Sequence, residues 1–467
     1  MHEGSSVGTI GFFNSASCGD GTNFSVLGGI MNFAEVATAA TAHFTVSGDG
    51  GVPGTVYFFG GTAANATFSV GIGGSVEMHD NSTAPNATFT VAGGTLTIDG
   101  SANAGESVID CSEGGQVIVS TYSTGALGGP QVTAHGATSS GRPPGQISLT
   151  QGGTADHATF VVEGGTSAGA PGAVMYVLAR SNLQNAQVTV TGGTSGGDGS
   201  AIVFKGKSDG GRGSITMSGN ATFDMRKHDP VFLSIGSIEG EGSVLLGSNQ
   251  LQLGNNNLNA TFSGVIEEGC ECAGSLNKIG TGILTLSGAN TYTGGTILTG
   301  GGLVISNATG SGTGTGNVTV QAGKLGGSGI IAGATTIGTG SGAGAFLAPA
   351  VETNVRATLT IQSTLTFNAD ATYTYTFRAK RNRARTDKVI ANGVTINSGA
   401  TLALSGQTRG ALRQGMVLTL ISNTSANPIS GTFSNLPDGG IVIINGNNLQ
   451  ASYSGGDGND LTLTVMP

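Results

Sequence analysis

Short segments in which apolar and polar residues alternate recur along the chain, and a glycine-rich corner follows each of them. Five copies align when they are placed under one another: residues 42–46, 66–70, 87–91, 158–162 and 186–190. In each copy Phe or Val and a second Val are separated by one, mostly polar, residue, so the apolar side chains point to one side of a strand. A second alternating pair follows the corner, such as Val76 with Met78 or Leu96 with Ile98. The pattern predicts β-strands joined by tight turns.

The spacing between copies indicates what the strands build. Phe24, Phe44, Phe68 and Phe89 are 20 to 24 residues apart, and later copies are further apart because their corners are longer. This period matches one coil of a β-solenoid, whereas a propeller blade needs roughly 40 residues. One coil buries too few side chains to offset its lost entropy, so coils must stack. We predict an all-β, right-handed parallel β-helix (β-solenoid); the alternative is a sandwich of hairpins, whose short strands look similar in sequence.

The composition supports a β fold and argues against two classes of partner. The 467 residues include 85 Gly and no Trp, and only 10% are charged, so the residues that solvate helix surfaces are scarce. The formal net charge of −9 argues against a nucleic-acid surface, which needs a basic stripe. No apolar run approaches the ~20 residues of a membrane span. We therefore expect neither nucleic-acid binding nor a membrane-spanning segment.

The second half of the chain changes character near Ser237. The run from Lys278 to Ile297, with Asn290-Thr-Tyr-Thr-Gly-Gly295 inside it, closely resembles the autotransporter-associated β-strand repeat of bacterial surface proteins. Weaker similarity extends over residues 237–467. The resemblance implies a right-handed β-helical passenger region on the bacterial outer surface or outside the cell. It implies no catalytic residues, because this repeat is a structural unit.

The location follows from this resemblance alone. Residues 1–13 lack the basic-then-apolar order of a signal peptide. The repeat pattern is already under way at Phe24, so we expect the sequence to be part of a longer chain.

The pattern and the resemblance together divide the chain into three predicted segments. Residues 1–236 form a β-helical array of Phe-x-Val repeats, residues 237–365 an autotransporter-associated repeat array, and residues 366–467 a C-terminal β segment that caps the solenoid. A cap is expected because an open last coil would expose a sheet edge. The predicted function is a surface-exposed or secreted scaffold, a passenger-like stalk or adhesin, with no catalytic site, cofactor or metal. Its partner is an unidentified surface or extracellular ligand, for which polysaccharide is a candidate.

The alternative function is a β-helical polysaccharide lyase or hydrolase. Such enzymes need carboxylates, or carboxylates and a base, that converge on one groove. The best local cluster in the sequence contains the following residues: Glu77, His79, Asp80, Asp99 and Asp110. An offset of about 21 residues per coil places Asp99 beside Met78 and not beside another carboxylate. With 5% aromatic residues, we expect no aromatic platform for sugar rings beside the cluster.

Two further motifs have metal-ligand chemistry. Residues 455–460, Gly-Gly-Asp-Gly-Asn-Asp, resemble one calcium-binding nonapeptide of the repeats-in-toxin type. Such a site shares ligands between consecutive turns, so we interpret the segment as a glycine corner, with calcium binding by Asp457 and Asp460 as the alternative. Cys270 and Cys272 could form a local bridge or half a metal site. We expect loop thiols, because no matching Cys or His pair lies nearby in the sequence.

Two recurring patterns have a structural and a functional interpretation. The basic run is predicted to be a solvated loop between strands at residues 373–377 and 389–390, with polyanion binding as its alternative; its members are Arg378, Lys380, Arg381, Arg383, Arg385 and Lys388. Asn-x-Ser/Thr sequons recur at Asn65, Asn86, Asn220, Asn259 and Asn307. We interpret these Asn residues as corner residues of the repeat, not as glycosylation sites.

Overall fold

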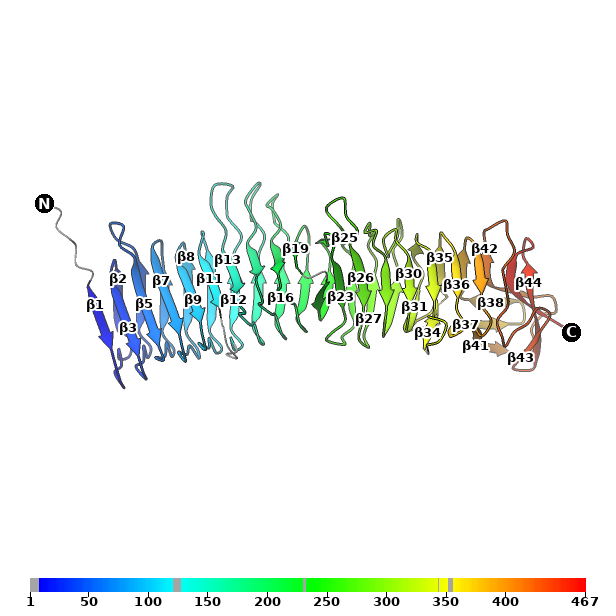
Figure 1. Ribbon diagram of the computed structural model, residues 1–467, viewed down its shortest axis with the longest axis horizontal. Helices are drawn as coiled ribbons and strands as arrows, with labels where there is room; N and C mark the ends of the chain where they lie inside the picture. Colours follow the sequence, from blue (N-terminus) through cyan, green and yellow to red (C-terminus); the bar gives the residue numbers. More distant parts are fainter. Residues whose placement is uncertain (1–7, 121–126, 230–231, 343, 352–355) are drawn as a thin grey trace. The chain divides into compact units, whose positions relative to one another are not determined.

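The computed structural model describes residues 8–120, 127–229, 232–342, 344–351 and 356–467, and every element in them is a β-strand (Figure 1). Of the opening segment 1–13, residues 1–7 lie outside the described residues. The chain divides into two compact units, Met1–Leu245 and Leu246–Pro467. In the described part of the chain there is no helix with the length and apolar character that a membrane crossing requires.

The first unit is a stack of coils, each of which contributes one strand to each of two parallel sheets. The strands of the first sheet, in order, are β1 (Thr9–Phe12), β3 (Ile30–Ala34), β5 (Gly54–Phe59), β7 (Gly74–His79), β9 (Thr95–Asp99), β11 (Gln116–Ser120), β13 (Gln146–Thr150), β15 (Val174–Val177), β17 (Ala201–Gly206), β19 (Thr222–His228) and β22 (Ser243–Leu245). Those of the second are β2 (Asn23–Leu27), β4 (His43–Ser47), β6 (Thr67–Val70), β8 (Thr88–Ala92), β10 (Val108–Ser112), β12 (Gln131–Ala134), β14 (Thr159–Val162), β16 (Gln187–Val190), β18 (Ser214–Met217) and β21 (Ser237–Gly240). A further strand is β20 (Phe232–Ile235).

Equivalent residues of successive coils lie directly beside one another. Phe24 pairs with Phe44, Phe44 with Phe68 and Phe68 with Phe89. Their rings stack with centroids 5.2, 4.7 and 4.9 Å apart. Phe44, Phe68 and Phe89 are at most 2% exposed, so the ladder of rings forms part of the core. The predicted alternation and the predicted period are both confirmed by this register.

The second unit continues the coil architecture with shorter strands. Its parallel strands are β23 (Gln250–Leu253), β26 (Ser275–Lys278), β28 (Thr296–Leu298), β30 (Val318–Val320), β33 (Thr335–Ile337), β36 (Leu365–Phe367) and β40 (Val394–Ile396); β24 (Ala260–Phe262), β27 (Ile283–Leu286), β29 (Gly302–Ile305), β31 (Gly323–Gly327), β34 (Ala345–Leu347), β37 (Ala371–Lys380) and β41 (Thr401–Arg409); and β32 (Ile330–Ile331), β35 (Thr358–Ile361), β39 (Lys388–Ala391) and β42 (Val417–Asn423). Two further short strands are β25 (Val265–Glu267) and β38 (Arg383–Thr386).

The side chains of residues 290–295 hold neighbouring coils of the second unit together. Asn290 is buried; its Oδ1 accepts from the N–H of Ile266 at 2.8 Å, and its Nδ2 donates to the carbonyl of Gly312 at 2.6 Å. This amide therefore joins three coils. The fully buried Tyr292 hydroxyl lies 2.6 Å from Oγ1 of Thr296. Gly295 has φ +89°, a left-handed conformation that a residue with a Cβ rarely adopts.

Antiparallel strands close the C-terminal end of the second unit. β42 pairs with β45 (Asp460–Val465), β45 with β44 (Asn447–Gly455), and β44 with β43 (Ile441–Ile444), all antiparallel. The Tyr453 hydroxyl fixes this region, since it donates to the Leu436 carbonyl at 2.7 Å and accepts from the Phe433 N–H at 3.0 Å. The predicted parallel β-solenoid with a C-terminal β cap is confirmed, and the hairpin sandwich is wrong. The segment boundaries at 236 and 365 stay predictions.

Candidate functional site

A group of aromatic and polar side chains lies on the outer face of the first sheet, on β5, β7 and β9. The register pairs Tyr57 with Glu77 and Phe59 with His79. The alternate residues Val56 and Phe58 point into the core and are 0% exposed. Because successive side chains of a strand point to opposite faces, the aromatic and polar residues must face outward. We call Tyr57, Phe59, Glu77, His79 and Asp99 the Tyr57 face.

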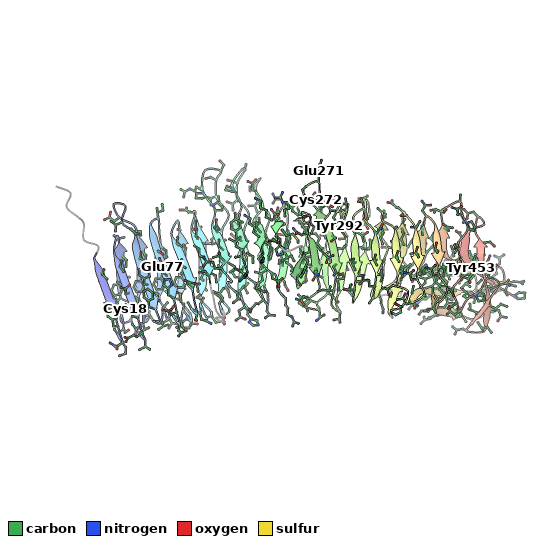
Figure 2. All side chains as sticks on the ribbon, in the orientation of Figure 1. Cys18, Glu77, Glu271, Cys272, Tyr292 and Tyr453 are labelled. Carbon is green, nitrogen blue, oxygen red and sulfur yellow. A yellow bond between two sulfur atoms is a disulfide. The ribbon has the colours of Figure 1, made fainter. Side chains whose placement is uncertain are left out.

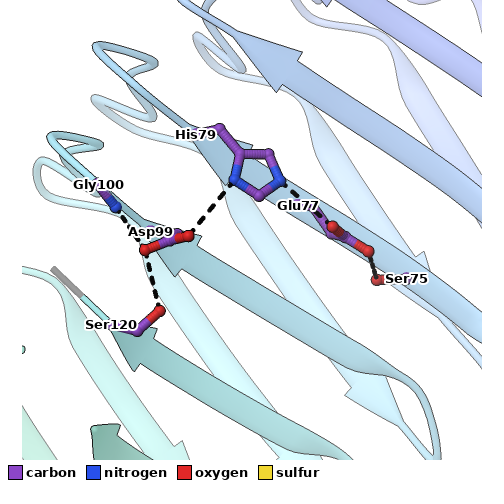
Figure 3. A network of polar contacts seen from close by, with 6 residues as sticks. All are labelled: Ser75, Glu77, His79, Asp99, Gly100 and Ser120. Atoms are coloured by element: carbon purple, nitrogen blue, oxygen red, sulfur yellow. Dashed lines mark hydrogen bonds and ion pairs between the residues drawn. The ribbon is translucent and has the colours of Figure 1, made fainter. Parts of the chain in front are cut away.

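His79 lies between two carboxylates of the Tyr57 face (Figure 3). Its Nε2 is 3.2 Å from Oε2 of Glu77, and its Nδ1 is 3.8 Å from Oδ2 of Asp99. Oε1 of Glu77 accepts from the Ser75 hydroxyl at 3.1 Å. Oδ1 of Asp99 accepts from the Gly100 N–H at 2.7 Å and from the Ser120 hydroxyl at 3.1 Å. The hydrogen bonds fix the orientation of both carboxylates, while their side chains stay 28% and 33% exposed.

Three rings form a partly exposed stack beside these carboxylates. The Tyr57 and Phe59 centroids are 5.6 Å apart, and Phe59 is 5.2 Å from the His79 ring at an interplanar angle of 13°. Phe59 is 42% exposed. Partial burial, and then the charge of Glu77, raise the pKa of the Tyr57 hydroxyl. A partly exposed aromatic ring can contact the apolar face of a sugar, and flanking polar groups can hydrogen-bond its hydroxyls.

The structure corrects one expectation about the carboxylate cluster. Met78 pairs with Ile98, so this coil has 20 residues instead of 21 and Asp99 lies beside His79. Aromatic rings also lie beside the cluster, because Tyr57 and Phe59 come from the preceding coil. The sequence could have predicted this, because a parallel register with the same offset as between neighbouring coils pairs residues 57 and 59 with residues 77 and 79.

The remaining members of the predicted cluster lie elsewhere. Asp80 occupies the corner after β7 with φ +55°. Asp110 is on the second sheet, where the His135 Nε2 is 3.7 Å from it and the His135 Nδ1 is 2.8 Å from Glu163. His135 and Glu163 line a hollow of about 290 Å³ with Arg142, which bonds Glu113 at 2.7 Å. His135 and Glu163 were not predicted to be neighbours, because they are 28 residues apart along a coil with a longer corner.

Five of the six residues of the basic run lie on strands and Arg381 lies in the turn between two of them, so its interpretation as a solvated loop is wrong. β37 extends to Lys380 and turns at residues 381–382 into β38, which pairs with it antiparallel. Ala379 and Ala384 alternate with the charged residues. This period of two is typical of a β-strand, but a loop was predicted because so many of the residues are charged.

The glycine corner at residues 455–460 connects two antiparallel strands. Asp457 lies in the turn between β44 and β45, and Oδ1 of Asp460 accepts from the Asn423 N–H at 2.9 Å. Within the described ranges no three His, Cys, Asp or Glu side chains come together as a metal site would require.

The four cysteines fall into two groups. Cys270 and Cys272 form a disulfide, so the expectation of loop thiols is wrong; their Cα atoms are 5.4 Å apart, which allows the bond. Their loop, with Glu271, projects from the strands (Figure 2). Cys18 and Cys111 are free, and burial raises their pKa values to about 11 and about 12.

Three sequon asparagines bond to a neighbouring coil. Oδ1 of Asn220 accepts from the Gly193 N–H at 2.8 Å, and Oδ1 of Asn259 from the Ile283 N–H at 2.8 Å. Asn307 is 3% exposed and accepts from the Ile330 N–H at 2.9 Å. Asn65 and Asn86 donate their backbone N–H groups to the Ala40 and Ala64 carbonyls. Such hydrogen bonds to a neighbouring coil fit the interpretation of these Asn residues as corner residues of the repeat.

A family model matches part of the second unit. Residues 276–305 match the passenger-associated-transport-repeat. This chain carries an autotransporter passenger-type repeat. The matched segment contains the Asn290, Tyr292 and Gly295 interactions described above, and it overlaps the run from Lys278 to Ile297 on which the resemblance was predicted. That prediction is confirmed.

The chain was also compared with curated proteins and with solved structures. No curated protein matches the passenger-repeat chain. The crystal structure of the Haemophilus influenzae Hap adhesin is similar with 12% identity and a TM-score of 0.23, and the alignment covers 96% of this chain and 64% of that one. Because this TM-score is low, the fold assignment rests on the strand register of this chain and not on its similarity to that structure.

Proposed function

We propose that the chain is an extracellular or bacterial outer-surface scaffold that binds glycan at the Tyr57 face and catalyses no reaction. The passenger-type repeat supports the location, and the in-register coils support a role in holding shape. The observation that carries the binding proposal is the partly exposed stack of Tyr57, Phe59 and His79 beside two oriented carboxylates. Sugar rings are recognised by stacking on aromatic faces and by hydrogen bonds to fixed polar groups.

The arrangement favours binding over hydrolysis for a geometric reason. Glu77 and Asp99 are turned toward the same imidazole, and each also accepts a serine hydroxyl bond. Their oxygens are thus engaged within the sheet surface and not directed at a common point in solvent. An acid and a base for glycoside cleavage have to flank one bond of the substrate.

The test is a glycan array followed by affinity measurement on the strongest neutral glycan. In Tyr57→Ala/Phe59→Ala the affinity should fall about tenfold or more, since each lost stacking contact contributes about 0.5–1.5 kcal/mol. The matched control is Phe13→Ala/Phe232→Ala, which removes two rings that are 55% and 52% exposed at other places. Equal affinity of the two double variants would exclude the Tyr57 face.

The same glycans test the enzyme alternative. Incubation with the wild-type chain should release no reducing ends and no unsaturated sugars. Product formation that is lost in Glu77→Gln or Asp99→Asn would make the chain a lyase or hydrolase.

Protease added to intact bacterial cells that make the chain should degrade it, because the proposed location is external.

A further inference from the structure

The hairpin of β37 and β38 places four cations on one side. The antiparallel register sets Arg378 opposite Arg385 and Lys380 opposite Arg383. Directly opposite residues of two strands lie on the same face, and all four side chains are exposed. The alternate residues Phe377 and Ala379 are buried, so the two faces of the hairpin are sharply different.

A third strand widens this surface. β41 runs parallel to β37 on its other side and sets Gln407 beside Arg378 and Arg409 beside Lys380. Gln407 and Arg409 are exposed too. We call the resulting three-strand surface the basic face; it consists of Arg378, Lys380, Arg383, Arg385, Gln407 and Arg409. Strands lie about 4.8 Å apart and alternate residues about 6.7 Å apart, so the charges form a regular grid.

The positive charge of the basic face is not neutralised within the described residues. None of its five cations takes part in an ion pair there, although the chain as a whole has a net charge of −9. Nine of the 18 Lys and Arg residues fall between 356 and 413, together with only two acids. Of these, Asp387 is 2% exposed and Asp370 accepts the N–H groups of Thr339, Gly340 and Gly342. Like charges directly opposite one another destabilise a strand pair, and a bound anion would relieve that repulsion.

We propose that the basic face binds an acidic polysaccharide, carboxylated or sulfated. Arginine forks match carboxylate and sulfate-like oxygens in a bidentate way, and four of the five cations are arginines. Charge complementarity to a repeating polyanion carries the assignment. The face has no aromatic residue on which nucleic-acid bases would stack and no aliphatic residue to enter a membrane.

A hollow lies beside β38, on the side of the strand opposite to Arg383 and Arg385. It measures about 450 Å³ and is lined by Arg356 and Lys388 together with Ala384 and Thr386 of the opposite side of β38. Ligand sites typically have about 300–1,000 Å³. The hollow therefore adds two cations, and room for a ring, next to the hairpin.

The experiment measures binding of the full chain to heparin and to polygalacturonate at several NaCl concentrations. The test variant is R378Q/K380Q/R383Q/R385Q, and the matched control is R180Q/K207Q/R212Q/K227Q, which neutralises four exposed cations of the first unit. Both variants lose four positive charges, so their net charges are equal. We expect Kd for at least one polysaccharide to rise tenfold or more in the test variant and less than twofold in the control. Wild-type affinity should fall as salt rises.

Several results would overturn the proposal. One is the absence of wild-type binding to either polysaccharide; another is an equal loss in both variants, which would show a response to net charge alone. Tighter wild-type binding to duplex DNA or to phosphatidylglycerol vesicles would assign the face to that partner instead. If circular dichroism shows that the quadruple variant is unfolded, Arg383→Gln at the end of β38 takes its place, with an expected threefold rise in Kd. Tyr57→Ala/Phe59→Ala should keep full polyanion binding, because the basic face is independent of the proposed glycan site.

Discussion

Lys278 is a charged residue inside the second unit. It is 1% exposed, because the alternation of β26 points Leu276 and Lys278 to the same, inner side. Its Nζ donates to the Ile279 carbonyl at 2.6 Å, to the Gly300 carbonyl at 3.3 Å and to the Gly280 carbonyl at 3.4 Å. Burial lowers the pKa of this ammonium group to about 8 from 10.5. The group bridges adjacent coils through their backbones.

This lowered pKa predicts a pH dependence of stability. Between about pH 8 and 10.5 the unfolded chain holds the proton and the folded chain releases it, so the free energy of unfolding rises with pH in that window. The Lys278→Met variant has no ammonium group at this position, so its free energy of unfolding lacks this rise with pH. We expect wild type to gain about 2 kcal/mol relative to Lys278→Met between pH 7 and 9.5, as measured by urea unfolding. A difference between the two proteins that stays constant with pH would contradict the assignment.

Single residues were the least predictable level of this molecule. Glu77, His79 and Asp99 were predicted as one cluster, but the predicted neighbour of Asp99 was one position away from the true one. Corners that differ by one residue cause such errors, because a one-residue shift moves a side chain to the opposite face of a strand. The length of each corner depends on turns such as the one at Asp80, whose left-handed φ has no distinct sequence signal in an aspartate.

The strand is the scale at which neighbouring coils depend on each other. Phe68 stacks on Phe44 on one side and on Phe89 on the other, and it also meets Phe58 of the first sheet edge-on at 5.9 Å. Each ring therefore shares its buried surface with the coils before and after it. In repeat proteins, stability is a sum of such nearest-neighbour terms.

Phe68→Ala should destabilise the first unit locally. Removing a fully buried Phe costs about 3–5 kcal/mol, and we expect faster amide hydrogen exchange in β4, β6 and β8 with little change in β17 and β19. Ile72→Ala is the matched control, because Ile72 is 82% exposed in the corner after β6. Uniformly faster exchange across the unit would argue against nearest-neighbour coupling.

Elements were predicted well where apolar residues alternate and poorly where charges do. The copies at 42–46, 66–70 and 158–162 became strands in the expected register. The sequence Arg-Ala-Lys-Arg-Asn-Arg-Ala-Arg has the same period of two, yet strongly charged strands are rare enough that a loop was preferred. Its two alanines, the buried Ala379 and the half-buried Ala384, point to the side of the hairpin away from the charges, in place of Val or Phe.

At the scale of the whole molecule, the repeat has to end without an open parallel edge. In the second unit the change from parallel to antiparallel pairing at β42 and β45 serves this purpose. The last strand of that sheet, β43, is only four residues long. A short edge strand gives other chains little to pair with. The cap was predictable because every solenoid needs one, but its hairpin topology was not.

Removal of the cap should make the chain associate with itself. We expect a chain ending at Leu436, which lacks β43, β44 and β45, to form larger species at concentrations where the full chain does not, since the edge of β42 becomes free. Size-exclusion chromatography with light scattering checks this. The control is full-length Ile441→Ser/Ile443→Ser, which removes the exposed apolar residues of β43 and keeps the pairing. A truncated chain that behaves like the full chain would refute the role of the cap.

The one-to-one register between coils also bears on how the gene can change length. Loss of residues 68–88 would join Thr67 to Phe89, after which Phe44 would face Phe89 and Val56 would face Leu96, both pairs of the kinds already present. Recombination between neighbouring repeats can thus delete or duplicate a coil without disturbing the packing of those that remain. The array can therefore lose or gain one coil at a time while each remaining coil keeps neighbours of the same kind.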